Sequence, residues 1–81
     1  MKINVLLFAQ ARQIANADSV ELSLKPDARV SDLKAALAGA VPELSDLLSR
    51  SSIAVNQQYA VAHDRIPESA EVAMIPPVSG G

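Results

Sequence analysis

The chain has 81 residues and a net charge of −2, from seven basic and nine acidic side chains; 49% of its residues are hydrophobic and 20% are charged. This length suits one small domain, and this composition is typical of a compact globular protein. With no cysteine and one histidine, His63, the sequence excludes disulfides, thiolate metal sites and cysteine nucleophiles, and we expect no metal centre. No basic cluster is present, so we expect neither nucleic acid nor a membrane as partner.

The apolar segments contain no targeting signal that we can identify. The longest apolar stretch, from Val5 to Ala9, is far shorter than the roughly 20 residues that span a bilayer. Asn4 interrupts the apolar run that a signal peptide needs, and no cleavage region follows it. We therefore expect a cytoplasmic protein.

Residues 2–9 have the alternating pattern of a strand. The side chains predicted to face the core are Ile3, Val5 and Leu7. Leu6 and Phe8 lie on the opposite face, which begins with Lys2 and Asn4. This second face therefore becomes apolar toward the C-terminal end of the strand.

Three more elements are predicted in the first half of the chain. Residues 9–15 form a short helical candidate, and the turn residues 16–18 separate it from an alternating strand at residues 19–24. The residues of this strand that are predicted to face inward are Val20, Leu22 and Leu24. Apolar residues then recur at helical spacing from Val30 to Ala40, which predicts the main helix.

The second half contains a short helix and three short strands. Pro42 suits the first turn of a helix that runs to about Leu48. The predicted strands are residues 53–55, 59–61 and 71–75, and Asn56-Gln57 forms a turn between the first two. This order predicts an α+β fold of the β-grasp type, in which a mixed sheet has its helices packed on one face.

The C-terminal segment is the part of the chain that packing does not explain. We divide the chain into a folded domain, residues 1–75, and an extended, flexible tail, residues 76–81. The proline pair at the start of the tail ends the last strand and stiffens the chain, because proline has no amide hydrogen and a fixed φ. The tail ends in Gly80-Gly81, which can pass through a channel too narrow for side chains. Six extended residues reach roughly 20 Å, enough to enter a buried site on a partner.

The carboxylate of Gly81 is the group through which this tail could react. A terminal carboxylate is an anion at neutral pH and needs activation before acyl transfer. We hypothesise that an ATP-using partner adenylates it, and that sulfide then converts it to a thiocarboxylate, which is nucleophilic at neutral pH. A frayed terminus without function is the alternative that the residues leave open.

Three segments resemble the small subunit of molybdopterin synthase, a family of ubiquitin-like sulfur carriers with the β-grasp fold. These are residues 7–12 (LFAQAR), 54–57 (AVNQ) and 71–81 (EVAMIPPVSGG), which together extend over the whole chain. The Pro-Pro-Val-Ser-Gly-Gly ending is fairly specific, whereas a terminal Gly-Gly alone is shared with thiamin sulfur carriers and ubiquitin. The sequence departs from the family at Gln13, where an acidic residue is common, and at Ser69-Ala70, where Gly-Asp is common.

The resemblance implies a role in molybdenum cofactor biosynthesis. Gly81 would be adenylated by an E1-like enzyme that uses ATP, and then converted to a thiocarboxylate. The tail would enter the large subunit, which converts cyclic pyranopterin monophosphate to molybdopterin within a heterotetramer of two small and two large subunits. The catalytic residues would belong to the large subunit, so this chain would be no enzyme on its own and would bind no permanent cofactor.

A β-grasp sheet also predicts a binding patch at the root of the tail. Its first and last strands are parallel neighbours, so Phe8 should lie beside Ile75. If Val72 and Met74 face the core, then Leu6, Phe8, Ala73 and Ile75 form an apolar patch on the open face. We predict that this patch contacts both partners. The other residues predicted to bind partners are Arg12, Pro76, Pro77, Val78 and Ser79.

Two alternative functions remain open. Another ubiquitin-like sulfur carrier of the thiamin type, or a protein modifier, would use the same tail for a different acceptor. A noncovalent β-grasp interaction module would not need Gly80-Gly81 at all.

Overall fold

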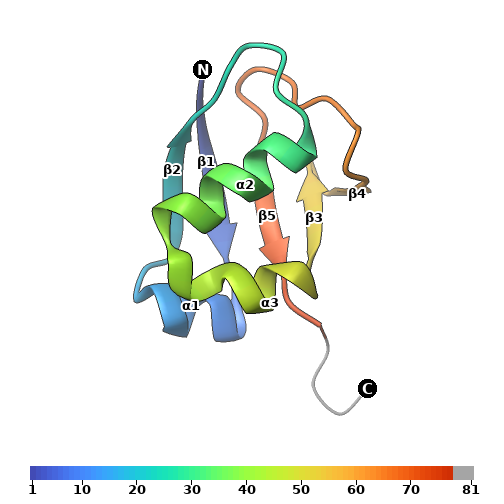
Figure 1. The fold of residues 1–81 in the computed structure, drawn as a ribbon. Coiled ribbons are helices and arrows are strands. Elements are labelled where there is room, and N and C mark those ends of the chain that lie inside the picture. Colours follow the sequence, from blue (N-terminus) through green and yellow to red (C-terminus); the bar gives the residue numbers. More distant parts are fainter. Residues whose placement is uncertain (78–81) are drawn as a thin grey trace.

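The computed structural model describes residues 1–77, which form one five-stranded sheet with helices on one face (Figure 1). The strands are β1 (Lys2–Leu7), β2 (Ser19–Ser23), β3 (Ser52–Val55), β4 (Gln58–Ala60) and β5 (Val72–Ile75). The helices are α1 (Ala9–Ala15), α2 (Val30–Ala40), the 3₁₀ helix η1 (Pro42–Leu44) and α3 (Ser45–Ser49). The predicted α+β class and the one-sided placement of the helices are confirmed. None of the helices in residues 1–77 has the length and apolar character needed to cross a membrane.

The sheet has the strand order β2-β1-β5-β3-β4, with β5 at its centre. β1 pairs antiparallel with β2 and parallel with β5, and β3 pairs antiparallel with both β5 and β4. In the parallel pair, Leu6 is in register with Ala73 and Leu7 with Met74. β1 and β5 therefore end together, at the end of the sheet where α1 and α3 lie (Figure 1).

The hydrophobic core lies between the sheet and the helices. The predicted core positions on β1 and β5 are confirmed, because each is at most 2% exposed: Ile3, Val5, Leu7, Val72 and Met74. Leu33 and Leu37 of α2 are fully buried against this face. On β2, Leu22 is buried as predicted, while Val20 is only partly buried because this strand forms the edge of the sheet. Leu24 was predicted to face inward from the same strand, but it lies just after β2 and is also only partly buried.

Several element boundaries differ from the prediction by one or two residues. β1 ends at Leu7 rather than Ala9, because Ala9 takes a left-handed backbone with φ 49°, although Phe8 remains extended. Asn56 and Gln57 have φ of 50° and 69°, and this pair of positive values is typical of a type I′ hairpin turn. The predicted turn between β3 and β4 is therefore confirmed.

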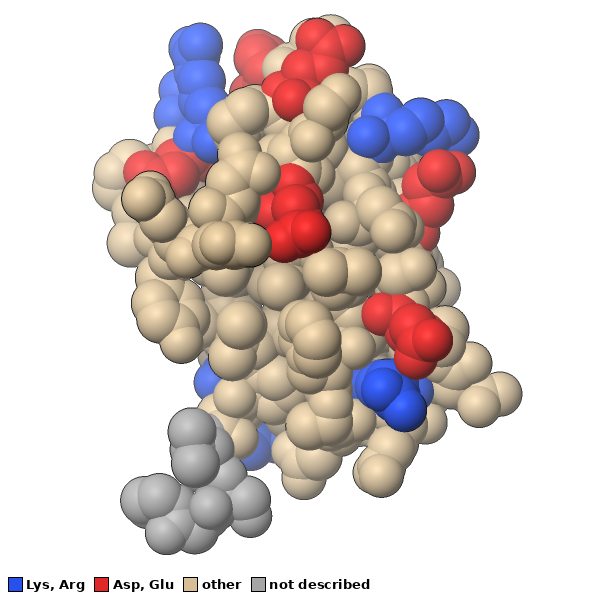
Figure 2. Space-filling view, turned by 180° about the vertical axis from the view of Figure 1, so that it is seen from behind, with Lys and Arg blue, Asp and Glu red and all other residues tan. Residues whose placement is uncertain are grey.

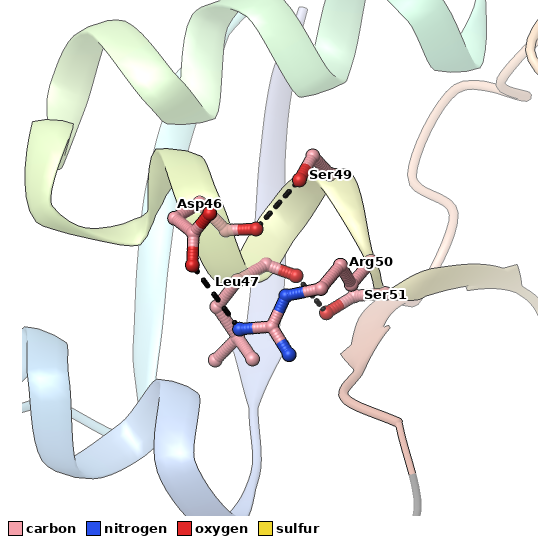
Figure 3. A network of polar contacts seen from close by, with 5 residues as sticks. All are labelled: Asp46, Leu47, Ser49, Arg50 and Ser51. Atoms are coloured by element: carbon pink, nitrogen blue, oxygen red, sulfur yellow. Dashed lines mark hydrogen bonds and ion pairs between the residues drawn. The ribbon is translucent and has the colours of Figure 1, made fainter.

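Between α3 and β3, side-chain hydroxyls donate hydrogen bonds to backbone carbonyl groups of this short helix (Figure 3). The hydroxyl of Ser49 donates to the carbonyl of Asp46 at 2.6 Å, and that of Ser51 donates to the carbonyl of Leu47 at 2.6 Å. The guanidinium of Arg50 bonds the Asp46 carboxylate at 3.2 Å. Because helix ends leave carbonyls without intrahelical partners, these side chains let α3 stop without a glycine cap.

The turn that leads into β5 contains a strained residue. The amide of Ala70 donates to the carbonyl of Pro67 at 3.2 Å, and Ser69, the third residue of this turn, has φ 62°. A left-handed backbone costs a residue with a side chain roughly 1–2 kcal/mol, which glycine avoids. Serine at this position is therefore strained, whereas glycine would not be.

We predict that Ser69→Gly raises the free energy of unfolding by about 0.5–1 kcal/mol, since the relief of strain exceeds the entropy that glycine loses. Urea unfolding measures the change. Ser52→Gly is the matched control, because Ser52 is equally solvent-facing but lies within β3. That control should lower the free energy of unfolding by about 0.5–1 kcal/mol. A loss of stability in both variants would contradict the strain at Ser69.

Candidate partner-binding groove

The open face of the sheet carries a row of side chains that crosses four strands. Leu6 is in register with Ala73, Ala73 with Ala54, and Ala54 with Tyr59. Paired residues in neighbouring strands project from the same face, so these four side chains lie side by side. The two alanines in the middle are short and the residues at either end are long, which leaves a groove between them.

This docking groove follows β5 and β3 on the face opposite α2. Its lining residues are Leu6, Phe8, Ala54, Gln57, Tyr59, Glu71, Ala73 and Ile75. Figure 2 shows this face, on which neutral side chains cover most of the area and charged side chains lie mostly toward the margins. All the lining residues except Gln57 and Glu71 are aliphatic or aromatic, so contact with a partner through this groove would be largely apolar.

The aromatic side chains of the docking groove are well exposed. Phe8 retains 46% of its accessible surface and Tyr59 retains 74%, whereas Leu6, Ala73 and Ile75 are partly buried. Exposed apolar side chains gathered on one face often mark a protein interface. The structure brings together the four residues of the predicted apolar patch; their contact with partners stays a prediction.

The root of the tail lies directly beyond one end of the docking groove. Ile75 ends β5 and lines the groove, Pro76 is partly buried and Pro77 is exposed. The remaining residues predicted to act in the tail, Val78, Ser79, Gly80 and Gly81, lie outside the described residues. A partner that covers the groove would thus meet the chain where the tail begins.

Arg12 lies apart from the docking groove. It projects from α1, and its Nε is 3.2 Å from the Asp18 carboxylate. It lines a separate hollow with Gln13, Asn16, Ala17 and Asp18. Both members of this ion pair are largely exposed, so the pair adds little to stability and could be exchanged for a partner's carboxylate. The predicted binding role of Arg12 stays a prediction.

Sequence reasoning missed half of the groove, namely Ala54, Gln57, Tyr59 and Glu71. A two-residue turn at Asn56-Gln57 fixes Ala54 opposite Tyr59, so the turn signal could have placed Tyr59 on the open face. Glu71 was harder to place, because it precedes β5 and depends on a distant contact. The amide of Asn56 donates to the carbonyl of Glu71 at 2.8 Å, and the amide of Glu71 donates to the side-chain oxygen of Asn56 at 2.9 Å.

The strand order, with the last strand at the centre of the sheet, defines the class of ubiquitin-like β-grasp proteins. The model of the ThiS family matches residues 5–81, and the chain belongs to this family. This membership agrees with the resemblance to ubiquitin-like sulfur carriers that the sequence shows.

Named relatives extend over the full length of the chain. The molybdopterin synthase sulfur carrier subunit of Chlamydomonas reinhardtii is 36% identical over 83 residues and is aligned over 100% of both chains. The corresponding subunit of Dictyostelium discoideum is 37% identical over 84 residues, covering 99% of this chain and 96% of its own length. These relatives confirm the resemblance to the small subunit of molybdopterin synthase.

A similar solved structure carries a different name. The small archaeal modifier protein 1 of Haloferax volcanii superposes with a TM-score of 0.89 at 29% identity, covering 100% of both chains. The β-grasp fold is therefore confirmed, and it is shared by relatives that are named for sulfur transport and for protein modification.

Proposed function

We propose that this chain is the sulfur carrier subunit of a molybdopterin synthase and that Gly81 carries the sulfur. The observation that carries this proposal is the end-to-end similarity to two subunits of that name, at 36% and 37% identity. The position of the docking groove supports it, because a carrier needs a surface through which enzymes can hold the root of its tail. The chain delivers the reactive group, and its enzymes supply the catalytic residues.

The proposed chemistry begins at the C-terminal carboxylate. An oxygen of the Gly81 carboxylate attacks the α-phosphorus of ATP on an E1-like enzyme, which releases pyrophosphate and leaves an acyl adenylate. A sulfide-level sulfur then displaces AMP and forms the thiocarboxylate. If the donor is a persulfide, a thiol supplies two electrons to release this sulfur and becomes part of a disulfide.

The second half of the proposed cycle takes place on the large subunit. The thiocarboxylate sulfur displaces an oxygen substituent from an electrophilic carbon of cyclic pyranopterin monophosphate, so that a C–S bond forms as the C–O bond breaks and the departing oxygen takes up a proton. Water then cleaves the resulting thioester. Sulfur stays on the substrate, and the Gly81 carboxylate is restored for another round. We propose a cytoplasmic heterotetramer of two small and two large subunits; ATP is used by the activating enzyme, and this chain holds no permanent cofactor.

A protein modifier is the second candidate, favoured by the superposition on small archaeal modifier protein 1. The first step is the same, since adenylation makes the Gly81 carbonyl electrophilic in both cases. The acceptor then differs, because a modifier forms an isopeptide bond with a lysine amine while a carrier accepts sulfur. The product that forms at Gly81 therefore distinguishes the two functions.

We predict that intact-mass spectrometry detects the exchange of one C-terminal oxygen for sulfur after incubation with the activating enzyme, ATP and a sulfur donor. The enzymes should come from the same genome as this chain. A variant that lacks Gly80-Gly81 is the control and should show no change in mass. Attachment to lysines without any thiocarboxylate would favour the modifier. Full activity of the shortened variant would favour a noncovalent module.

We predict that Phe8→Asp and Ile75→Asp each weaken binding to the large subunit by about tenfold or more, because each buries an unpaired carboxylate in an apolar contact. Isothermal titration calorimetry measures the affinity, and circular dichroism checks the fold. Ile14→Asp is the matched control: Ile14 is 44% exposed, close to the 46% of Phe8, but lies on α1 outside the docking groove. Equal affinities for all three variants would remove the groove from the interface.

A further inference from the structure

Glu71 is the one charged side chain among the described residues that line the docking groove. It is exposed, and it precedes Val72, which faces the core, so Glu71 belongs to the open face with Ala73 and Ile75. The ion pairs found within residues 1–77 join Lys2 to Glu21, Arg12 to Asp18, and Arg50 to Asp46. None of them involves Glu71, so its carboxylate has no cation partner within the described part of the chain.

The backbone of Glu71 is held in place by the β3–β4 turn. Its amide and carbonyl groups both bond to Asn56, at 2.9 Å and 2.8 Å. Asn56 sits in the left-handed region at φ 50°, where asparagine is better tolerated than most residues. Two bonds to this turn hold the backbone from which the carboxylate projects, so on binding only the side chain has to be ordered.

A carboxylate at this position constrains whatever covers the groove. An apolar surface laid over Glu71 would remove water from an unpaired charge, which is strongly unfavourable. A partner that supplies a lysine or arginine there would instead form an ion pair at the edge of an apolar contact. Charge pairs of this kind contribute more to orientation and association rate than to total affinity.

Glu71 and Ile75 mark the two ends of the groove along β5. Ile75 lies four residue steps after Glu71 along extended chain, a distance of about 13 Å. The tail leaves from the Ile75 end, so a cation that binds the Glu71 end fixes which end of the groove points toward the partner's active site. The alanines Ala54 and Ala73 form the floor between these ends and leave room for one apolar side chain.

We propose that Glu71 is the orienting contact of the docking groove. Each enzyme that handles the tail places an apolar side chain over Ala54 and Ala73 and a lysine or arginine against Glu71. This inference rests on the proposed function, because it concerns the activating enzyme and the large subunit. Each of these two enzymes must bind the tail where it leaves the folded domain. Each therefore comes into contact with the Glu71 carboxylate.

A second copy of this chain is a poorer occupant of the groove. Symmetric pairing of two open faces would bring two Glu71 carboxylates into one apolar interface, and the groove residues include no basic side chain to neutralise them. Each carboxylate would then lose water without gaining a cation, which opposes association. Sedimentation velocity should accordingly find the chain monomeric, and a dimer broken by Phe8→Asp would overturn the proposal.

The deciding experiment measures the affinity of Glu71→Gln and Glu71→Lys for each enzyme at low and at physiological salt. We expect about threefold weaker binding for Glu71→Gln and about tenfold for Glu71→Lys at low salt, with the difference from wild type shrinking as salt rises. Glu68→Lys is the matched control, because it makes the same charge change at an exposed turn residue outside the groove. It should bind within about twofold of wild type.

A charge exchange completes the test. Reversing one basic residue of each enzyme to glutamate should restore its binding to Glu71→Lys while weakening its binding to wild type. If wild type is thiocarboxylated but Glu71→Lys binds either enzyme no more weakly than Glu68→Lys does, the orienting contact is wrong and the carrier function stands. If wild type gains no sulfur and binds neither enzyme, the proposed function fails and this inference fails with it.

Discussion

The parallel pairing of β1 with β5 is the constraint on which the rest of the structure depends. It joins the first strand of the chain to the last at the centre of the sheet, with Leu6 beside Ala73 and Leu7 beside Met74. Such a pair cannot be closed by a short turn, so the chain between its two strands must cross over one face of the sheet, here from β2 at one edge to β3 on the far side of β5. That crossing supplies α2, which covers one face and leaves the other open (Figure 1).

Because side chains alternate along β1 and β5, one face of these strands packs in the core and the other face lines the docking groove. Val5, Leu7, Val72 and Met74 are buried on the helix-covered face, while their neighbours Leu6, Ala73 and Ile75 line the docking groove on the other face. β1 and β5 therefore contribute side chains both to the core and to the docking groove. The C-terminal segment also follows directly from β5. A substitution on the open face can alter binding without opening a cavity in the core, because the two sets of side chains never meet.

Local patterns in the sequence predicted the parts of the structure that depend on nearest neighbours. Alternation identified the core face of β1, helical spacing identified α2, and the pair Asn56-Gln57 identified the hairpin turn. The C-terminal end of β1 was harder to predict, because nothing in the sequence marks Ala9 as left-handed. The left-handed backbone conformation of Ala9 is set by the tertiary fold, which overrides the local preference of alanine.

The candidate site was predictable only where it lay on strands with a strong pattern. Leu6, Phe8 and Ile75 follow from the pairing of a β-grasp sheet. β4 has three residues and no clear alternation, so its own pattern does not place Tyr59, and only the register set by the Asn56-Gln57 turn does. Glu71 owes its place to hydrogen bonds with Asn56, fifteen residues away in the chain. Contacts at such separations leave no trace in a local pattern, and the charge at the end of the groove emerged only from the fold.

The central claim is that a terminus without side chains enters a confined site and reacts through its last carbonyl group. The most direct test adds one phenylalanine after Gly81 and measures molybdopterin formation with the activating enzyme and the large subunit, with intact mass confirming that the added residue is retained. The account predicts a loss of about a hundredfold or more, because a displaced reacting group loses most of its rate. Product formation at the wild-type rate by the untrimmed variant would contradict it.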